Sequence, residues 1–154
     1  MSLVINRVSV VIRREDKIIL IFRHKNNRDY YAIPGGHIEP EETPKLAIIR
    51  EIQEELGIKL DNLQFEFETE SANRRDYFFS ATTQNTDFTV TGPEAKHLDD
   101  SNNLFRPLWV TQSDLSKYPI FPDSGRQLVN KIIADITKWN LLSNAPKKKI
   151  FKFI

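Results

Sequence analysis

The sequence contains no cysteine among its 154 residues. Without thiols the chain cannot form a disulfide, hold zinc through thiolates or use a cysteine nucleophile. A reducing compartment suits such a chain, and we therefore expect a cytoplasmic protein. Glycine is also scarce, with 5 residues in all. Two of them, Gly35 and Gly36, are adjacent and permit tight backbone geometry at that point.

Long apolar runs are absent as well. No window approaches the roughly 20 apolar residues that a membrane-spanning helix needs, and the N-terminus lacks the regions of a signal peptide. We expect no membrane partner. A strong charge of either sign is also missing, because 22 Lys+Arg balance 21 Asp+Glu to a formal net charge of +1. A dedicated nucleic-acid binder usually has a clear basic excess, so a nucleic-acid partner is not expected.

Length and composition favour a single domain over residues 1–154, with 40% hydrophobic residues available for one core. Alternating apolar residues predict strands, and apolar residues at helical spacing predict helices. The expected strands are 4–13, 17–23, 30–33, 58–69, 75–82, 86–90 and 107–110. The expected helices are 44–56 and about 124–139, with a helical turn at 113–117. This order predicts an α/β protein with a mixed sheet.

The C-terminal segment 146–154 is too short to form a domain. It contains Lys147, Lys148 and Lys149, followed by five residues that are mostly apolar. The favoured interpretation is a solvated linker that ends in an edge strand or a packing segment. An arm that binds phosphate is the alternative.

Local signals define the first helix. Thr43 is a suitable N-cap, Pro44 occupies the first helical position, and Gly57 is a common terminator. Residues turn by roughly 100° each along a helix, so three carboxylates share about one third of its circumference. These carboxylates are Glu51, Glu54 and Glu55. The apolar stripe expected to be buried against the sheet is Leu46, Ile49, Ile52 and Leu56.

Three clustered carboxylates repel one another, so stability alone does not favour them. Oxygen ligands in this arrangement suit Mg²⁺, which relieves the repulsion, binds a diphosphate and activates water. Ala47 lies one turn before Glu51, where a small side chain would leave room for a phosphate. Arg50 and Glu42 offer an ion pair between the helix and the preceding loop. The alternative for the acidic face is ordinary solvated surface.

The segment GHIEPEETPKLAIIREIQEELGI, residues 36–58, resembles the Nudix box G-x5-E-x7-R-E-U-x-E-E-x-G-U, in which U is a bulky aliphatic residue. The matching residues are Gly36, Glu42, Arg50, Glu51, Ile52, Glu54, Glu55, Gly57 and Ile58. Every defined position is filled at the required spacing. This sequence is therefore identified as resembling the Nudix hydrolase (MutT-like) family.

The resemblance implies an α/β/α sandwich around a mixed sheet. It also implies Mg²⁺-dependent hydrolysis of a phosphoanhydride in a nucleoside diphosphate derivative, with Mn²⁺ as the alternative metal. Glu54, Glu55 and the Gly35 carbonyl are then metal ligands, and Glu51 is a ligand or the base that accepts the proton of water. Gly36, Glu42 and Arg50 are structural supports. The family also allows a homodimer.

Residues outside the box are less defined by the pattern. Many Nudix proteins carry a further catalytic acid in a loop before the penultimate strand, and Glu94 is the residue expected here, with Asp99 and Asp100 as competitors. The residues expected to bind substrate are Arg23 and Arg28, which could contact phosphate, and Tyr31, which could stack on a base. His37, directly after the glycine pair, could reach the metal region.

Two further functions remain open at this point. An RNA 5′ pyrophosphohydrolase would use the same box, although the near-neutral charge argues against it. A non-catalytic nucleotide-metabolite sensor would keep the fold, but such domains usually lose the box carboxylates. An isoprenoid-diphosphate isomerase of the same superfamily resembles an enzyme with a catalytic cysteine, which this chain lacks.

Overall fold

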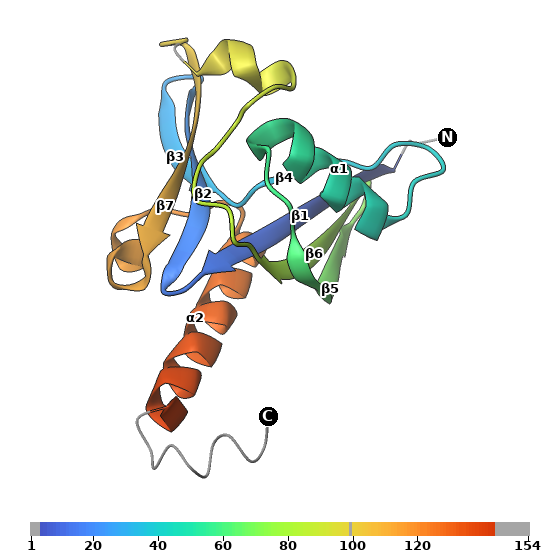
Figure 1. Ribbon diagram of the computed structural model, residues 1–154. Helices are drawn as coiled ribbons and strands as arrows, with labels where there is room; N and C mark the ends of the chain where they lie inside the picture. The colour runs from blue at the N-terminus through green and yellow to red at the C-terminus, as the bar shows by residue number, and fades with distance from the viewer. Residues whose placement is uncertain (1–3, 99, 144–154) are drawn as a thin grey trace.

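The computed structural model describes residues 4–98 and 100–143, and side chains within that part except those of 93, 94 and 135–143. The elements follow one another along the chain as shown in Figure 1. The strands are β1 (Ile5–Arg14), β2 (Lys17–Lys25), β3 (Arg28–Ala32), β4 (Gly35–His37), β5 (Asp61–Ser71), β6 (Arg74–Thr82) and β7 (Asn103–Thr111). The helices are α1 (Pro44–Leu56), η1 (Pro93–His97), η2 (Gln112–Lys117) and α2 (Asp123–Ser143).

The seven strands form one mixed sheet in which five follow the order β3-β2-β1-β6-β5, while β4 pairs with β1 and β7 pairs with β2. Strand β1 pairs in parallel with β6 from Ile5 to Arg13, while its other edge is divided between two partners. It pairs with β2 only at Arg13 and Arg14, and with β4 at residues 7–9. Strand β2 continues instead along β3 and β7. Strands β1 and β2 therefore diverge, and β4 lies in the fork between them.

Two apolar cores cover the two faces of the sheet, because successive residues of a strand point to opposite sides. Val8, Val10 and Ile12 of β1 pack with the buried face of α1. Val11 of the same strand packs on the other face with Leu128 of α2. Figure 1 shows α1 and α2 on opposite sides of β1. The expected α/β/α sandwich around a mixed sheet is confirmed.

Helix α1 begins and ends as the sequence predicts. The Thr43 hydroxyl accepts a hydrogen bond from the Leu46 backbone N–H at 3.2 Å, and Pro44 follows it in the first turn. Gly57 ends the helix with φ 65°, in the left-handed region that favours glycine. A Cβ at this position would also lie 2.9 Å from the Thr89 Cβ. These caps orient the acidic stripe of the helix relative to the sheet.

The buried face of α1 differs from the expected one. Ala47, Ile48, Ile52 and Leu56 are fully buried. Leu46 and Ile49, which were expected in the buried stripe, are 57% and 43% exposed. The helix is rotated about its axis so that Ala47 faces the sheet, and this small side chain allows the helix backbone to approach the sheet closely. Ala47 therefore belongs to the core and does not leave space for a phosphate.

The segment 86–90, expected as a strand, is an irregular loop. Backbone N–H groups in and after this loop bind carbonyls at the end of α1, which have no partner inside the helix. Thr89 donates its N–H to the Leu56 carbonyl at 2.8 Å, and Thr91 donates to the Glu54 carbonyl at 3.2 Å. Phe88 stacks on Trp109 of β7, with ring centroids 5.9 Å apart. The loop thus joins α1 to β7.

Other boundaries shift modestly. Strand β5 begins at Asp61, because the fully buried Ile58 belongs to the connection from α1. Helix α2 extends from Asp123 to Ser143, beyond the expected 124–139. The tail 146–154 lies outside the described residues, so its two interpretations stay predictions. Within the described part of the chain, no helix has both the length and the apolar character needed to cross a bilayer.

Candidate active site

A cleft of about 580 Å³ opens where β1 and β2 diverge. It is lined by residues of α1, β2, β3 and β4, with single residues from β1 and β7. Its acidic lining residues are Glu39, Glu51, Glu54 and Glu55. Its basic lining residues are Arg7, Arg23, Lys25 and Arg50. The three carboxylates that the sequence placed on one face of the helix therefore share a cleft with cations from the sheet.

Strand β4 brings the glycine pair against both β1 and α1. A Cβ at Gly36 would lie 2.2 Å from the Glu51 Cδ and within 2.6 Å of both carboxylate oxygens. A Cβ at Gly35 would lie 2.1 Å from the backbone carbonyl oxygen of Val8. Position 36 is therefore a glycine because the Glu51 carboxylate packs on its backbone, and position 35 because the neighbouring strand does.

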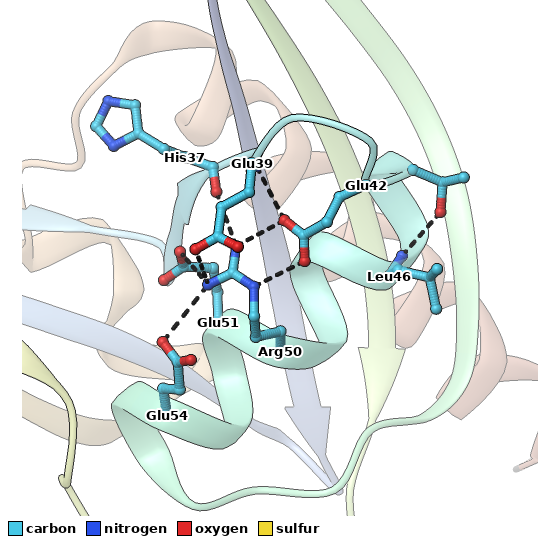
Figure 2. Close-up of polar contacts among 8 residues, drawn as sticks. His37, Glu39, Glu42, Leu46, Arg50, Glu51 and Glu54 are labelled. Atoms are coloured by element: carbon cyan, nitrogen blue, oxygen red, sulfur yellow. Dashed lines mark hydrogen bonds and ion pairs between the residues drawn. The ribbon is translucent and has the colours of Figure 1, made fainter.

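Arg50 is the centre of the polar network in Figure 2. Its Nε and Nη2 donate to the two oxygens of Glu42 at 2.7 and 2.8 Å, the bidentate geometry that makes such pairs strong. Its Nη2 also donates to the His37 carbonyl at 3.1 Å. The expected ion pair between Arg50 and Glu42 is thus present. It joins the loop after β4 to the middle of α1.

The same guanidinium reaches the acidic face of the helix. Its Nη1 donates to Glu51 at 3.0 Å and to Glu54 at 3.5 Å. The Glu42 carboxylate accepts a further hydrogen bond from the Glu39 N–H at 2.9 Å. Hydrogen bonds from Arg50 and Glu39 lower the pKa of Glu42 to about 2, so this anchor is ionised at any ordinary pH.

The three box carboxylates differ in environment. The Glu51 side chain is only 15% exposed and that of Glu54 is 46% exposed. Burial raises the pKa of Glu51, and the hydrogen bond from Arg50 opposes that rise. Glu55 is half-buried and lines the same cleft. In the part of the chain that the structure describes, no three His, Asp or Glu side chains are grouped to hold a metal ion.

The substrate residues expected from the sequence are divided between two places. Arg23 lines the cleft, where its guanidinium lies 5.4 Å from the centre of the Phe105 ring and donates to Asn103. Arg28 lines an adjacent hollow instead. Tyr31 does not reach the cleft.

The position of Tyr31 corrects the expectation that this residue contacts substrate. Its ring packs on Phe22 and Tyr118, on the face of the sheet that α2 covers. Burial raises its pKa, with the neighbouring Tyr118 adding to the rise. Because side chains alternate along β3, it is Tyr30 that lines the cleft. An aromatic doublet gives no indication of which member faces which side until the register with β2 is known.

The cleft also contains residues that sequence reasoning missed. Arg7 and Lys25 lie outside the box and in no motif, yet both line the cleft. The ring of Phe105 forms part of the lining beside Arg23. Alternation along β2 could have indicated Lys25, which shares a face with Arg23. No comparable signal identifies Arg7, because its position depends on the divergence of β1 from β2.

His37 lines the cleft, as the sequence allowed. Figure 2 shows its ring turned away from Arg50 while its carbonyl faces that residue. Burial lowers the pKa of His37, and the charges of Arg7 and Arg74 lower it further. The ring is therefore neutral near pH 7.

The further catalytic acid expected near residue 94 is described only in part. The Gly92 N–H donates to the Glu54 carbonyl at 3.1 Å, which brings η1 beside the end of α1. The Glu94 side chain lies outside the described side chains, and residue 99 lies outside the described residues, so Glu94 stays a prediction. Asp100 is an ion-pair partner of His97 at 3.5 Å, and the Asn102 N–H lowers its pKa.

Comparison with known proteins finds relatives of this chain among curated sequences. NAD-capped RNA hydrolase NudC from Salmonella paratyphi B and from Salmonella newport is 28% identical over 130 residues, which are 82% of this chain and 47% of the relative. The chain thus spans about half the length of the curated relatives it matches.

Solved structures share the fold. A MutT structure described for Aliivibrio salmonicida and Vibrio cholerae has a TM-score of 0.68 to this chain at 24% sequence identity. The match covers 85% of this chain and 98% of that one. A MutT NUDIX hydrolase from Burkholderia pseudomallei has a TM-score of 0.63 at 22% sequence identity. The match covers 82% of this chain and 95% of that one. The family model of the NUDIX domain matches residues 5–131. Since that match spans most of the chain and includes all of the box, the chain belongs to the NUDIX domain family.

Proposed function

We propose that this protein hydrolyses a phosphoanhydride bond in a nucleoside diphosphate derivative, with Mg²⁺ as its cofactor. The observation that carries the proposal is the cleft in which Glu51, Glu54 and Glu55 face cations of β2. Carboxylates bind a hard divalent cation, and basic side chains bind the phosphates that the cation does not neutralise. Members of the family generally use a divalent metal and act on nucleoside diphosphate derivatives.

The chemistry of the donors in the cleft suits such a cation, although the described side chains are not grouped to hold it. Glu51, Glu54, Glu55 and the Gly35 carbonyl would hold it, and all four supply the oxygen ligands that Mg²⁺ prefers. The Arg50 guanidinium already lies within 3.0 Å of Glu51 and 3.5 Å of Glu54, so both carboxylates have a positively charged neighbour in this structure. When bound, Mg²⁺ withdraws charge from the diphosphate and makes water more acidic.

The protein's own groups perform the remaining tasks. Glu51 has a pKa raised by burial, which makes its carboxylate a better proton acceptor for the attacking water. Arg50 limits that rise and keeps Glu51 positioned on Gly36. Arg23 and Lys25 would bind the phosphates, while Tyr30 and Phe105 offer ring surfaces to the rest of the substrate.

A substrate screen tests this function. The purified protein with Mg²⁺ is incubated with nucleoside triphosphates, nucleotide sugars, ADP-ribose, isoprenoid diphosphates and triphosphorylated or capped RNA, and products are identified by mass. We expect turnover of at least one nucleoside diphosphate derivative, with release of a nucleoside monophosphate or of pyrophosphate. Binding of these nucleotides without turnover of any of them would contradict hydrolysis and favour the sensor.

A pair of glycine variants separates the site from the fold. The Cβ of Gly36→Ala meets a carboxylate that can swing away, so we expect a stability change below about 1 kcal/mol and activity lowered by about 10- to 100-fold. The Cβ of Gly35→Ala meets backbone that cannot swing, so we expect a loss of about 1–3 kcal/mol in the free energy of unfolding.

Urea unfolding and steady-state kinetics on both variants check this prediction. Equal loss of stability in the two variants would show that the Glu51 contact is merely structural. Full activity in Gly36→Ala would remove Glu51 from the proposed reaction.

A further inference from the structure

A second hollow of about 580 Å³ adjoins the cleft on the side of the Phe121–Pro122 segment. The two share four lining residues, which are Arg7, Lys25, Tyr30 and Ala32. Each volume lies within the range of a single small-molecule site. A nucleoside diphosphate occupying the cleft would therefore leave the second hollow accessible to another part of the same substrate.

The second hollow is strongly cationic although the chain as a whole is nearly neutral. Arg7, Lys25, Arg28 and Arg74 line it, and Asp76 is its one acidic lining residue within the described part of the chain. Arg74 is bound to Asp76 by two hydrogen bonds of 2.7 and 2.9 Å, so this pair is largely neutral. Arg7, Lys25 and Arg28 remain, and the hollow has no further described acidic residue to neutralise them.

Two of these cations form no ion pair with the acidic residue of the second hollow. The Arg28 guanidinium lies 5.6 Å from the centre of the Tyr30 ring and 5.2 Å from that of Phe121. Arg7 is half-buried on β1 at the junction of the two hollows. Over residues 4–98 and 100–143, the Arg7 side chain has no hydrogen bond or ion pair, although its charge is near enough to Glu51 to oppose the rise that burial causes in the pKa of that carboxyl. The guanidinium of Arg7, which lines both hollows, can therefore donate to a bound anion.

We propose that the cleft and the second hollow form one continuous site for a substrate that carries a further phosphate beyond its scissile diphosphate, with Arg7 as a contact of that phosphate. The proposal rests on the proposed function, whose reaction it places in the cleft. The substrate class is a nucleoside diphosphate derivative with a phosphate monoester or phosphodiester on its sugar. Two sources share this chemistry, namely a bisphosphorylated small nucleotide and the 5′ end of an oligonucleotide.

Binding of ligands that contain no anhydride tests the proposal independently of turnover. AMP, adenosine 3′,5′-bisphosphate and the dinucleotide pApA are titrated by calorimetry with Mg²⁺ present. We expect at least one of the two larger ligands to bind about tenfold more tightly than AMP, with an affinity that falls more steeply with salt. A gain with the bisphosphate alone identifies a small nucleotide as the source. A gain with pApA identifies an oligonucleotide end.

Charge-removing variants locate the contact. Arg7 lines both hollows, whereas Arg28 lines only the second. We expect Arg7→Gln and Arg28→Gln each to reduce the tenfold gain in affinity to about threefold or less. Arg14→Gln is the matched control, since it removes the same charge from a half-buried position at the other end of β1 and should keep the full gain. Thermal unfolding verifies that each variant is folded.

Equal binding of all three ligands by the wild-type protein would overturn the proposal, whether or not the protein hydrolyses nucleotides. A gain that survives in both Arg7→Gln and Arg28→Gln would overturn it as well. Absence of turnover combined with a preserved gain would contradict the proposed function and leave this inference intact.

Discussion

Replacing Glu55 by Gln is expected to lower turnover by about 10²-fold or more while leaving the protein folded. The substitution keeps the size of the side chain and removes one negative charge from the cleft. Glu55 lines the cleft beside Glu51 and Glu54, whereas the buried face of α1 consists of other residues. Steady-state kinetics and thermal unfolding on the same preparation measure the two effects separately.

Glu68→Gln is the control for this prediction. Glu68 lies on β5, is 51% exposed and faces Arg75 at 3.8 Å, so the same chemical change there should leave turnover at the wild-type level. Near-normal turnover of Glu55→Gln would remove Glu55 from the set of metal ligands. A variant that is inactive and also unfolded would show that Glu55 supports the helix.

Removal of divalent metal by EDTA is expected to reduce hydrolysis to the background rate, and excess Mg²⁺ should restore it. The physical reason is that the proposed site contributes carboxylates, which cannot by themselves neutralise a diphosphate. Without a cation they repel it. The recovery is measured by titrating Mg²⁺ into the chelated enzyme, with Mn²⁺ titrated in parallel to compare the two metals.

Two observations distinguish loss of cofactor from loss of structure. Circular dichroism should be unchanged by chelation, because both cores and the Arg50–Glu42 pair are formed by the protein alone. Hydrolysis that persists after thorough chelation and dialysis would contradict the metal-dependent mechanism.

The acidic helix illustrates what could be predicted from sequence. Thr43, Pro44 and Gly57 are local signals, and each acts through its own backbone geometry, so the bounds of α1 were predicted correctly. The box spacing likewise identified the family and the cleft-lining carboxylates. The orientation of α1 was predicted less well, because the choice between Ile48 and Ile49 as the buried residue depends on how closely the helix approaches the sheet.

Residues outside the box show the opposite case. Tyr30 and Tyr31 are chemically identical neighbours, and only the pairing of β3 with β2 decides that Tyr30 faces the cleft. Arg7 lines the cleft because β4 displaces β2 from that end of β1. Neither fact has a local signature, since both depend on contacts between segments far apart in the chain.

The sequence by itself determined the α/β class, the acidic helix with its caps, and membership of the NUDIX domain family. These follow from periodicities and spacings within about 25 residues, the range over which helix geometry relates one side chain to the next. The tertiary structure alone decided which face of each element is buried and which cations meet the carboxylates. It also decided that a second basic hollow adjoins the cleft, because strand register and divergence depend on pairing across the whole sheet.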